Sequence, residues 1–240
     1  MSAAAVASPP QVIATVGLHS SASTWVFNVV RELLIAARGE SHVLSCYADE
    51  CAQVPEAAGR HLVIKSHSGS QDLDDWLVAS EARFLLSVRD PRDACVSMTQ
   101  RFKSPISHTV RWIAHDCARL IRLAPHGHLL LRYEDRFFDD RQAPKRIAVT
   151  LGLEPDPTAL DAIFDRYTTE SVRAFARSLS ALPSERLTTV VNFPIDRVTQ
   201  ILAPHIGDTQ IGKWLDLPFR QQVEMTRVFR AFLDQFGYPC

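Results

Sequence analysis

Residues 12–38 read VIATVGLHSSASTWVFNVVRELLIAAR and contain the clearest structural pattern in the chain. The apolar run 12–16 predicts a buried β-strand, and the apolar side chains of 24–38 recur at helical spacing. A turn of small residues joins the two. In such a strand–loop–helix unit, backbone N–H groups and the helix N-terminus point at one place, where they can bind an anion. The stretch therefore predicts an anion-binding loop at the edge of a sheet.

The same alternation of apolar runs and helical periodicity continues along the chain. It predicts an α/β fold, a single domain with a central parallel β-sheet flanked by helices. Strands are predicted at 12–16, 61–65, 84–88 and 128–133, and helices at 24–38, 72–80, 91–102, 107–123, 144–151, 157–165, 169–180 and 218–236. We expect residues 1–10 to form a flexible tail and 11–240 to form the domain. Residues 181–217 have several prolines and glycines, and we expect a long, mobile loop there, called the lid segment below.

Composition limits the classes of function. The chain has 240 residues and a mass of 26.8 kDa, and 46% of its residues are hydrophobic. Its net charge of -1 argues against a general nucleic-acid-coating role. No apolar run approaches the roughly 20 residues of a membrane span, and the start lacks a secretory pattern. The five cysteines include no CxxC pair, which is typical of reduced thiols. We expect a cytoplasmic protein with no nucleic-acid or membrane partner.

The loop after the first strand is similar to a phosphate-binding P-loop, GxxxxGK[ST]. The hydroxyls of Ser20, Ser21, Ser23 and Thr24 can add donors to the backbone N–H groups. Ala22, however, stands at the position of the second glycine, and Ser23 at that of the lysine. A nucleoside-triphosphate hydrolase normally needs that lysine on its terminal phosphates. The alternative to a phosphate site is an ordinary serine-rich helix start.

The second predicted strand runs directly into Lys65 and His67. Because ligands of open α/β sheets bind at the carboxyl ends of the strands, both side chains are candidates for a site. Residues two apart also point the same way if the strand continues. Histidine can act as a general base near neutral pH, and the lysine can neutralise developing negative charge. The alternative is a solvated strand end.

The third predicted strand ends at Arg89, and a helix follows it. Asp90 is a typical N-cap, with a proline at the next position. A guanidinium at Arg89 can bind a phosphate through two hydrogen bonds, and the hydroxyl of Ser97 can add a third. The alternative is a capping and ion-pair arrangement among the charged residues around Arg89.

In order and spacing these segments resemble sulfotransferases that use 3′-phosphoadenosine 5′-phosphosulfate (PAPS). The family loop Pro-Lys-Ser-Gly-Thr-Thr-Trp matches residues 19–25, and Lys-Thr-His matches 65–67. The block Arg-[Asn/Asp]-Pro-[Lys/Arg]-Asp with a following Ser matches 89–93 and 97. A C-terminal Gly-x-x-Gly-x-Trp element is similar to 209–214, and weaker matches are Tyr-Glu-Asp at 133–135 and the final Gly-Tyr at 237–238. The resemblance covers about residues 12–238.

This resemblance implies an enzyme that transfers a sulfuryl group from PAPS to a hydroxyl or amine of a small-molecule acceptor. The product of the donor is adenosine 3′,5′-bisphosphate (PAP). His67 would be the general base, and Lys65 would neutralise charge on the transferring group. The implied donor-binding residues are Ser20, Ser21, Ala22, Ser23 and Thr24 of the loop, Trp25 against the adenine, Arg89 and Ser97 at the 3′-phosphate, Tyr133 and Thr168 near the nucleotide, and Thr209, Gly212 and Lys213 of the C-terminal element. No metal is expected, because no carboxylate cluster lies beside the loop. A homodimer and a bacterial origin are further expectations.

The sequence departs from the family pattern at two places. Ser20 replaces the loop lysine, for which His19, Lys65 or Lys213 could substitute. Gly207-Asp208-Thr209 replaces the family Arg-Lys-Gly on the 3′-phosphate, and Asp208 would repel a phosphate if it pointed inward. His205 or Lys213 could compensate there.

Two alternatives to a sulfotransferase stay open. One is a P-loop-like small-molecule kinase, against which the missing loop lysine and Mg²⁺ carboxylates argue. The other is a non-catalytic member of the family that only binds nucleotide or protein. The acceptor is not defined by the sequence. Trp76, Phe102, Trp112 and Phe193 are candidates to shape its pocket, although core packing explains such residues equally well.

Overall fold

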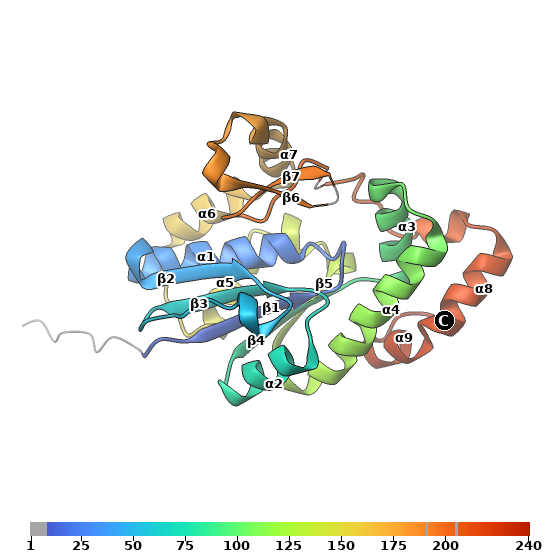
Figure 1. Cartoon of the computed structure of the whole chain (residues 1–240), viewed down its shortest axis with the longest axis horizontal. Coiled ribbons are helices and arrows are strands. Elements are labelled where there is room, and N and C mark those ends of the chain that lie inside the picture. Colours follow the sequence, from blue (N-terminus) through green and yellow to red (C-terminus); the bar gives the residue numbers. More distant parts are fainter. Residues whose placement is uncertain (1–8, 191, 205) are drawn as a thin grey trace, which may run out of the picture.

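Five parallel strands form the centre of the molecule. A computed structural model describes residues 9–190, 192–204 and 206–240, shown in Figure 1. The sheet order is β2 (Val43–Tyr47), β3 (His61–Ser66), β1 (Val12–Gly17), β4 (Arg83–Val88) and β5 (Gly127–Arg132). Every neighbouring pair is parallel, which confirms the predicted sheet. The sequence analysis missed β2, a short edge strand whose residues are all only partly buried and so give no clear pattern.

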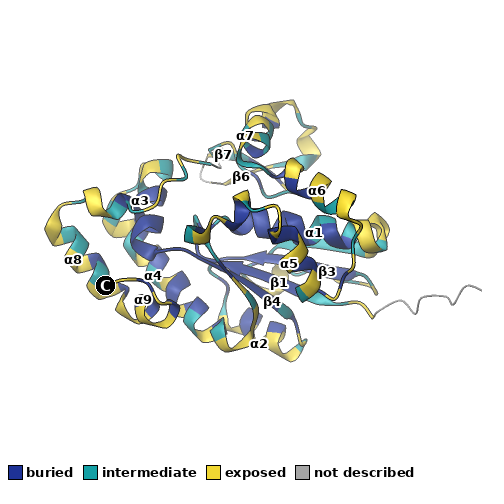
Figure 2. Ribbon diagram, turned by 180° about the vertical axis from the view of Figure 1, so that it is seen from behind, coloured by how far each residue is buried: buried dark blue, intermediate teal, exposed yellow. Residues whose placement is uncertain are grey.

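Helices cover both faces of this sheet, as Figure 1 shows. One face packs against α1 (Ser23–Arg38), α5 (Ala143–Thr150) and α6 (Pro157–Arg166), and the other against α2 (Gln71–Ala79), α4 (Ile106–Leu123) and α9 (Arg230–Phe236). Successive β1 residues alternate between these two cores: Ile13 lies in the first, Ala14 in the second. The inner strands are therefore buried on both faces and mostly apolar, and Figure 2 shows buried residues concentrated in the sheet and α1.

Helix α3 (Pro91–Phe102) starts as the sequence predicts. The Asp90 side chain accepts a hydrogen bond from Arg92 N, and Pro91 occupies the first turn. The Arg92 guanidinium also bonds Asp90, and it lies 3.7 Å from the centre of the Trp214 ring. These charged residues therefore form the predicted capping arrangement, and they also anchor the C-terminal segment to α3.

The lid segment is not a long loop throughout, and that expectation is wrong for its first half. After α7 (Thr169–Ser178), strands β6 (Leu187–Val190) and β7 (Phe193–Asp196) form an antiparallel hairpin. A buried carboxylate, Asp196, holds the hairpin through Arg186 at 2.7 Å. Pro194 lies within β7, and a proline argues against a central strand but is tolerated in an edge strand. This small sheet has only edge strands.

The predicted helix 218–236 is two helices, α8 (Phe219–Val228) and α9. They meet at Phe229, which is buried in the core on the face of the sheet that α9 covers, while most of α8 is exposed. Of the predicted tail, only Pro9 and Pro10 are described, and both are exposed. In the described part of the chain, no helix has the length and apolar character that crossing a membrane requires.

Candidate active site

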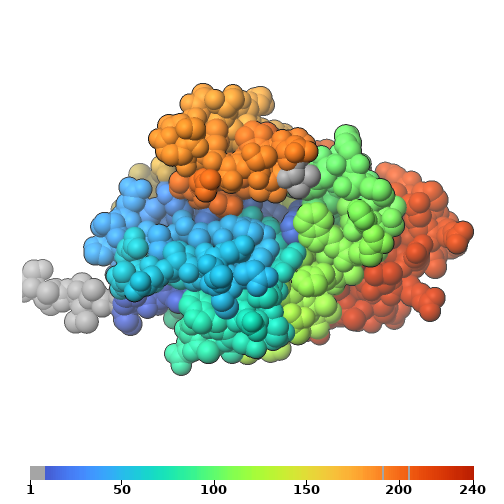
Figure 3. Space-filling view, viewed as in Figure 1, coloured from blue at the N-terminus to red at the C-terminus, as the bar shows by residue number. Residues whose placement is uncertain are grey.

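A cavity of about 630 Å³ lies beyond the carboxyl ends of β1, β3 and β4. The loop after β1, the end of β3, helix α3, Trp112 of α4 and the lid segment line it. Figure 3 shows a recess where the orange residues of the lid segment meet the blue and green residues beneath. The cavity has the size of a small-molecule site, and it lies where α/β sheets bind ligands.

The loop after β1 adopts strained backbone conformations although it lacks the P-loop glycine. Ser20 and Ala22 have φ values of 65° and 61°, in the left-handed region that favours glycine. Gly17 permits a close approach, because a Cβ there would lie 2.2 Å from Ser87 Oγ. The chain thus holds Ser23 and Thr24 at the cavity, at the N-terminus of α1. Ser21 instead faces away from the cavity lining and shares a hydrogen bond of 2.9 Å with Ser87.

His67 and Lys65 lie together opposite this loop, as their spacing predicts. His67 Nδ1 donates to Gly17 O at 2.6 Å, which leaves the lone pair of the neutral ring on Nε2. Lys65 Nζ lies 3.2 Å from that Nε2, and Ser23 Oγ lies 3.4 Å from it. Loop, imidazole and ammonium therefore form one cluster.

Burial sets the charge of this cluster. It lowers the pKa of His67 well below 6.5, and the nearby His19 and Lys65 lower it further. Burial also lowers the pKa of Lys65 to about 8, against an opposing effect of Asp49. At neutral pH the imidazole is therefore a neutral base, and most of the lysine is a cation.

Two carboxylates that the sequence analysis did not identify accept hydrogen bonds from residues of this cluster and its neighbours. Asp49 accepts hydrogen bonds from His67 N at 2.9 Å and from Ser66 Oγ at 2.7 Å. Asp116 of α4 is fully buried and accepts a 2.5 Å hydrogen bond from His19 Nδ1. The His19 ring stacks on His67, with ring centres 4.0 Å apart. No local pattern marks either carboxylate, since each acts on a residue distant in sequence.

Arg89 lies at the end of β4, as predicted. Other residues of the protein already contact most of its guanidinium. Its terminal nitrogens donate to Ser20 O at 3.2 Å and Gln210 O at 2.7 Å. Its guanidinium lies 4.0 Å from the centre of the Tyr133 ring. Ser97 lies on α3, buried, and lines the same cavity. Arg89 therefore connects the loop after β1, the C-terminal element and Tyr133, which is one of the residues predicted to bind the nucleotide.

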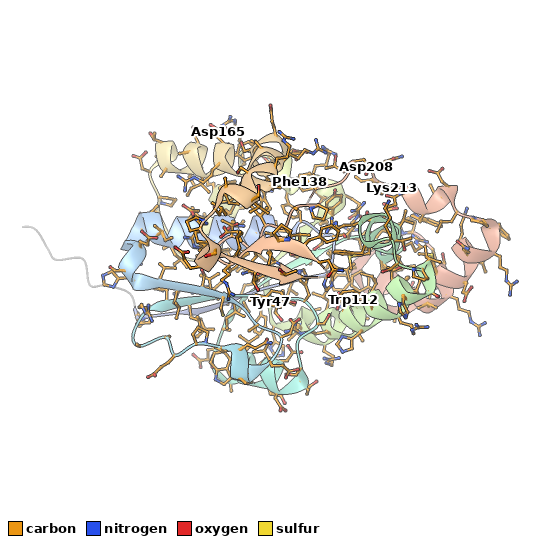
Figure 4. The ribbon with its side chains drawn as sticks, turned by 45° about the horizontal axis from the view of Figure 1, so that its top comes forward. Tyr47, Trp112, Phe138, Asp165, Asp208 and Lys213 are labelled. Atoms are coloured by element: carbon orange, nitrogen blue, oxygen red, sulfur yellow. The ribbon has the colours of Figure 1, made fainter. Side chains whose placement is uncertain are left out.

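Asp208 points to the cavity, and a cation neutralises it. Lys213 Nζ lies 3.1 Å from Asp208 Oδ1 and 3.0 Å from Gln100 Oε1. In the view of Figure 4 Asp208 and Lys213 lie next to each other, above Tyr47 and Trp112. Lys213 thus compensates the acidic residue at this end. His205, the other suggested substitute, lies outside the described residues.

The remaining predicted residues divide into two groups. Ser20, Ala22, Trp25, Tyr133 and Thr209 line the cavity with those above. Thr168 and Gly212 do not: Thr168 caps α7 by accepting from Ser171 N, and Gly212 N donates to Asp93 Oδ2. The neighbouring Thr169 lines the cavity in place of Thr168.

Two cations at the cavity, Arg101 and Lys103, were missed. Arg101 lies on α3 one turn beyond Ser97 and lines the cavity. Its four-residue spacing from Ser97 was the available signal, because residues four apart share a helix face.

Four buried side-chain atoms at the cavity have no hydrogen-bond partner among the described residues. They are Ser20 Oγ, Trp25 Nε1, Asn28 Oδ1 and Arg89 Nε. Three of them are donors, and buried donors normally have partners. Unpaired donors beside a helix N-terminus suit an anionic ligand. Over the described ranges, no group of three or more acidic, histidine or cysteine side chains is placed to bind a metal.

Comparisons with known proteins support the architecture. No protein-family model and no curated protein matches the sequence. Among solved structures, mouse sulfotransferase SULT7A1 complexed with PAP is similar, with a TM-score of 0.62, 13% identity, and coverage of 95% of this chain and 89% of that one. Retinol dehydratase is similar in two complexes with PAP, one with retinol and one with androsterone. Both have a TM-score of 0.57 and 14% identity, and they cover 94% of this chain and 82% and 81% of theirs. This chain therefore has the fold of the sulfotransferases.

Proposed function

We propose that the protein is a sulfotransferase that moves a sulfuryl group from PAPS to a hydroxyl or amine of a small-molecule acceptor. The observation that carries the proposal is the meeting of three parts in one cavity: the loop before α1, the Lys65–His67 pair, and Arg89 with Ser97. Solved structures of the same fold contain PAP, and one of them contains retinol.

The unpaired donors fit the charge of the proposed donor substrate. Ser20 Oγ and Arg89 Nε are buried and have no hydrogen-bond partner within the described part of the chain, and a phosphate oxygen can satisfy each of them. Ser23, Thr24 and the N-terminus of α1 would hold the phosphosulfate, and Arg89 with Ser97 the 3′-phosphate. Trp25, which lines the cavity, would lie against the adenine.

His67 acts as the general base. Its Nε2 takes the proton of the acceptor oxygen or nitrogen, while that atom forms a bond to sulfur and the bond from sulfur to the phosphate oxygen breaks. The electron pair leaves with PAP. Lys65, 3.2 Å from Nε2, neutralises charge on the transferring group and discourages protonation of His67 before the acceptor arrives. Catalysis is then mostly positioning and electrostatics.

Lys65 is the best substitute for the missing loop lysine. It lies beside Ser23 and His67, whereas Lys213 is paired with Asp208 and His19 with Asp116. A cytoplasmic location and a homodimer stay predictions.

Calorimetric titration with PAP, and with ATP plus Mg²⁺, tests the donor. We expect tight PAP binding that Mg²⁺ does not change, and weak ATP binding. Preference for ATP and Mg²⁺ would favour a kinase. A sulfate-transfer assay over phenols, alcohols and amines then tests catalysis. PAP binding with no transfer to any acceptor would favour the non-catalytic alternative.

A further inference from the structure

Arg101 is a half-buried cation at the cavity that has no partner among the described residues, whereas Lys103, which also lines the cavity, is exposed to solvent. Among the described residues its guanidinium makes no hydrogen bond or ion pair, and its one ring neighbour is Phe102, whose centre lies 5.9 Å away. By contrast, Arg89 donates to two carbonyls, and Lys213 is paired with Asp208. The side chain is only partly exposed, so solvent does not fully compensate its charge.

The position of Arg101 separates it from the proposed donor groups. It lies about 6 Å further along the axis of α3 than Ser97, since four residues rise about 1.5 Å each. Its neighbour Phe102 contacts Phe193 of β7, with ring centres 6.1 Å apart. Arg101 also lies near enough to Lys65 to lower the pKa of that lysine. Arg101 therefore lies near the Lys65–His67 pair, where the transfer is proposed to occur, and toward the β6–β7 hairpin.

The charges of the proposed donor have other partners. The loop, the start of α1 and Lys65 serve the phosphosulfate, and Arg89 with Ser97 serves the 3′-phosphate. Burial and the nearby Arg89 lower the pKa of Arg101 to about 10, so it is still a cation at neutral pH. Its planar guanidinium can donate two parallel hydrogen bonds to a carboxylate, sulfate or phosphate group.

We propose that Arg101 binds an anionic group of the acceptor, so that the substrate is a hydroxyl or amine compound bearing a carboxylate, sulfate or phosphate. This inference rests on the proposed sulfuryl transfer. A donor phosphate has the same chemistry, and the experiment separates the two sources.

The test is calorimetric titration of PAP-saturated protein with matched pairs of probes that differ only in charge. One pair is para-hydroxyphenylacetate and para-hydroxyphenylacetamide, and a second is gamma-hydroxybutyrate and its amide. We expect the wild-type protein to bind each carboxylate about tenfold more tightly than its amide. Arg101→Gln should abolish this preference, and Arg101→Lys should keep part of it because it keeps the charge. Arg111→Gln, at an exposed arginine on α4 outside the cavity lining, is the control and should keep all of it.

Three outcomes overturn the proposal. The first is a wild-type protein that binds carboxylates and amides equally or binds neither. The second is an Arg101→Gln protein that keeps the preference. The third is a loss of about tenfold or more in PAP affinity in Arg101→Gln, which would assign Arg101 to the donor. The same titration without PAP separates the two proposals: if PAP fails to bind but the Arg101-dependent preference persists, the sulfotransferase proposal fails and the anion site stands.

Discussion

Arg89 and Arg101 border the same cavity, twelve residues apart, yet their surroundings differ. Arg89 is buried, bonded to the backbone of the loop and of the C-terminal element, and stacked on Tyr133. Arg101 has no polar partner among the described residues. The first region is organised before any ligand binds, which lowers the entropic cost of binding a constant substrate. The region around Arg101 leaves a positive charge that a ligand can pair with, and so it is suited to distinguishing acceptors that carry an anionic group.

The Lys65–His67 pair lines the same cavity as these two arginines, and loss of His67 should have the largest effect. His67→Ala removes the proposed general base, so we expect kcat to fall by about a hundredfold or more. PAP affinity should change little, because His67 is not among the groups assigned to the donor. Stopped assays of transfer and calorimetry with PAP measure the two quantities. Unchanged turnover would remove His67 from its role.

Substitution of Arg89 should mainly weaken binding of the donor substrate, PAPS. Arg89→Ala removes hydrogen bonds to a charged group, each worth about 1.5–3 kcal/mol, so the KM for PAPS should rise about tenfold or more. Arg230→Ala, at an exposed ion pair on α9, is the control and should leave this KM unchanged. Equal donor affinity in Arg89→Ala and wild type would contradict the assignment and would reduce the contrast with Arg101.

The pH dependence tests the charge of the Lys65–His67 pair. Lys65 has a lowered pKa of about 8, so its cation is present below that pH and disappears as the pH rises through it. We expect kcat to fall above about pH 8. No acid limb is expected near 6.5, since the pKa of His67 lies well below that value.

The matched variant is Lys65→Arg, in which the guanidinium stays charged. The alkaline fall should then disappear from the pH profile even if the rate at neutral pH is lower. A wild-type profile that stays flat well above pH 8 would show that the charge of Lys65 is not needed.

The smallest expected effect concerns the loop that Arg89 holds. Ala22 has a left-handed backbone, which costs an L-residue other than glycine about 1 kcal/mol. Ala22→Gly should therefore raise the free energy of unfolding by at most about 1 kcal/mol, because glycine also loses more entropy on folding. Urea denaturation measures it. Gly17→Ala is the opposite case and should destabilise, since its Cβ would clash with Ser87. A destabilised Ala22→Gly would mean that the loop is not strained.

The parts that sequence predicted well are those that depend on near neighbours. The starts of α1 and α3 and the Lys65–His67 pair follow from periodicity, capping and strand alternation within about a dozen residues. The hairpin in the lid segment and the break at Phe229 were missed, because prolines obscured the first and continuous apolar spacing the second. In both, tertiary packing overrides local preference.

The sequence by itself determined the strand–loop–helix unit, the order of the polar motifs along the strand ends, and hence where a cavity would lie. Only the tertiary structure decided which charged side chains are paired within the protein and which are left for a ligand. It paired His19 with Asp116, 97 residues away, neutralised Asp208 with Lys213 and joined Arg89 to Gln210, and it left Arg101 without a polar partner among the described residues. Hydrogen bonds and ion pairs act only over a few ångströms, so distant residues form them only after packing has brought their elements together.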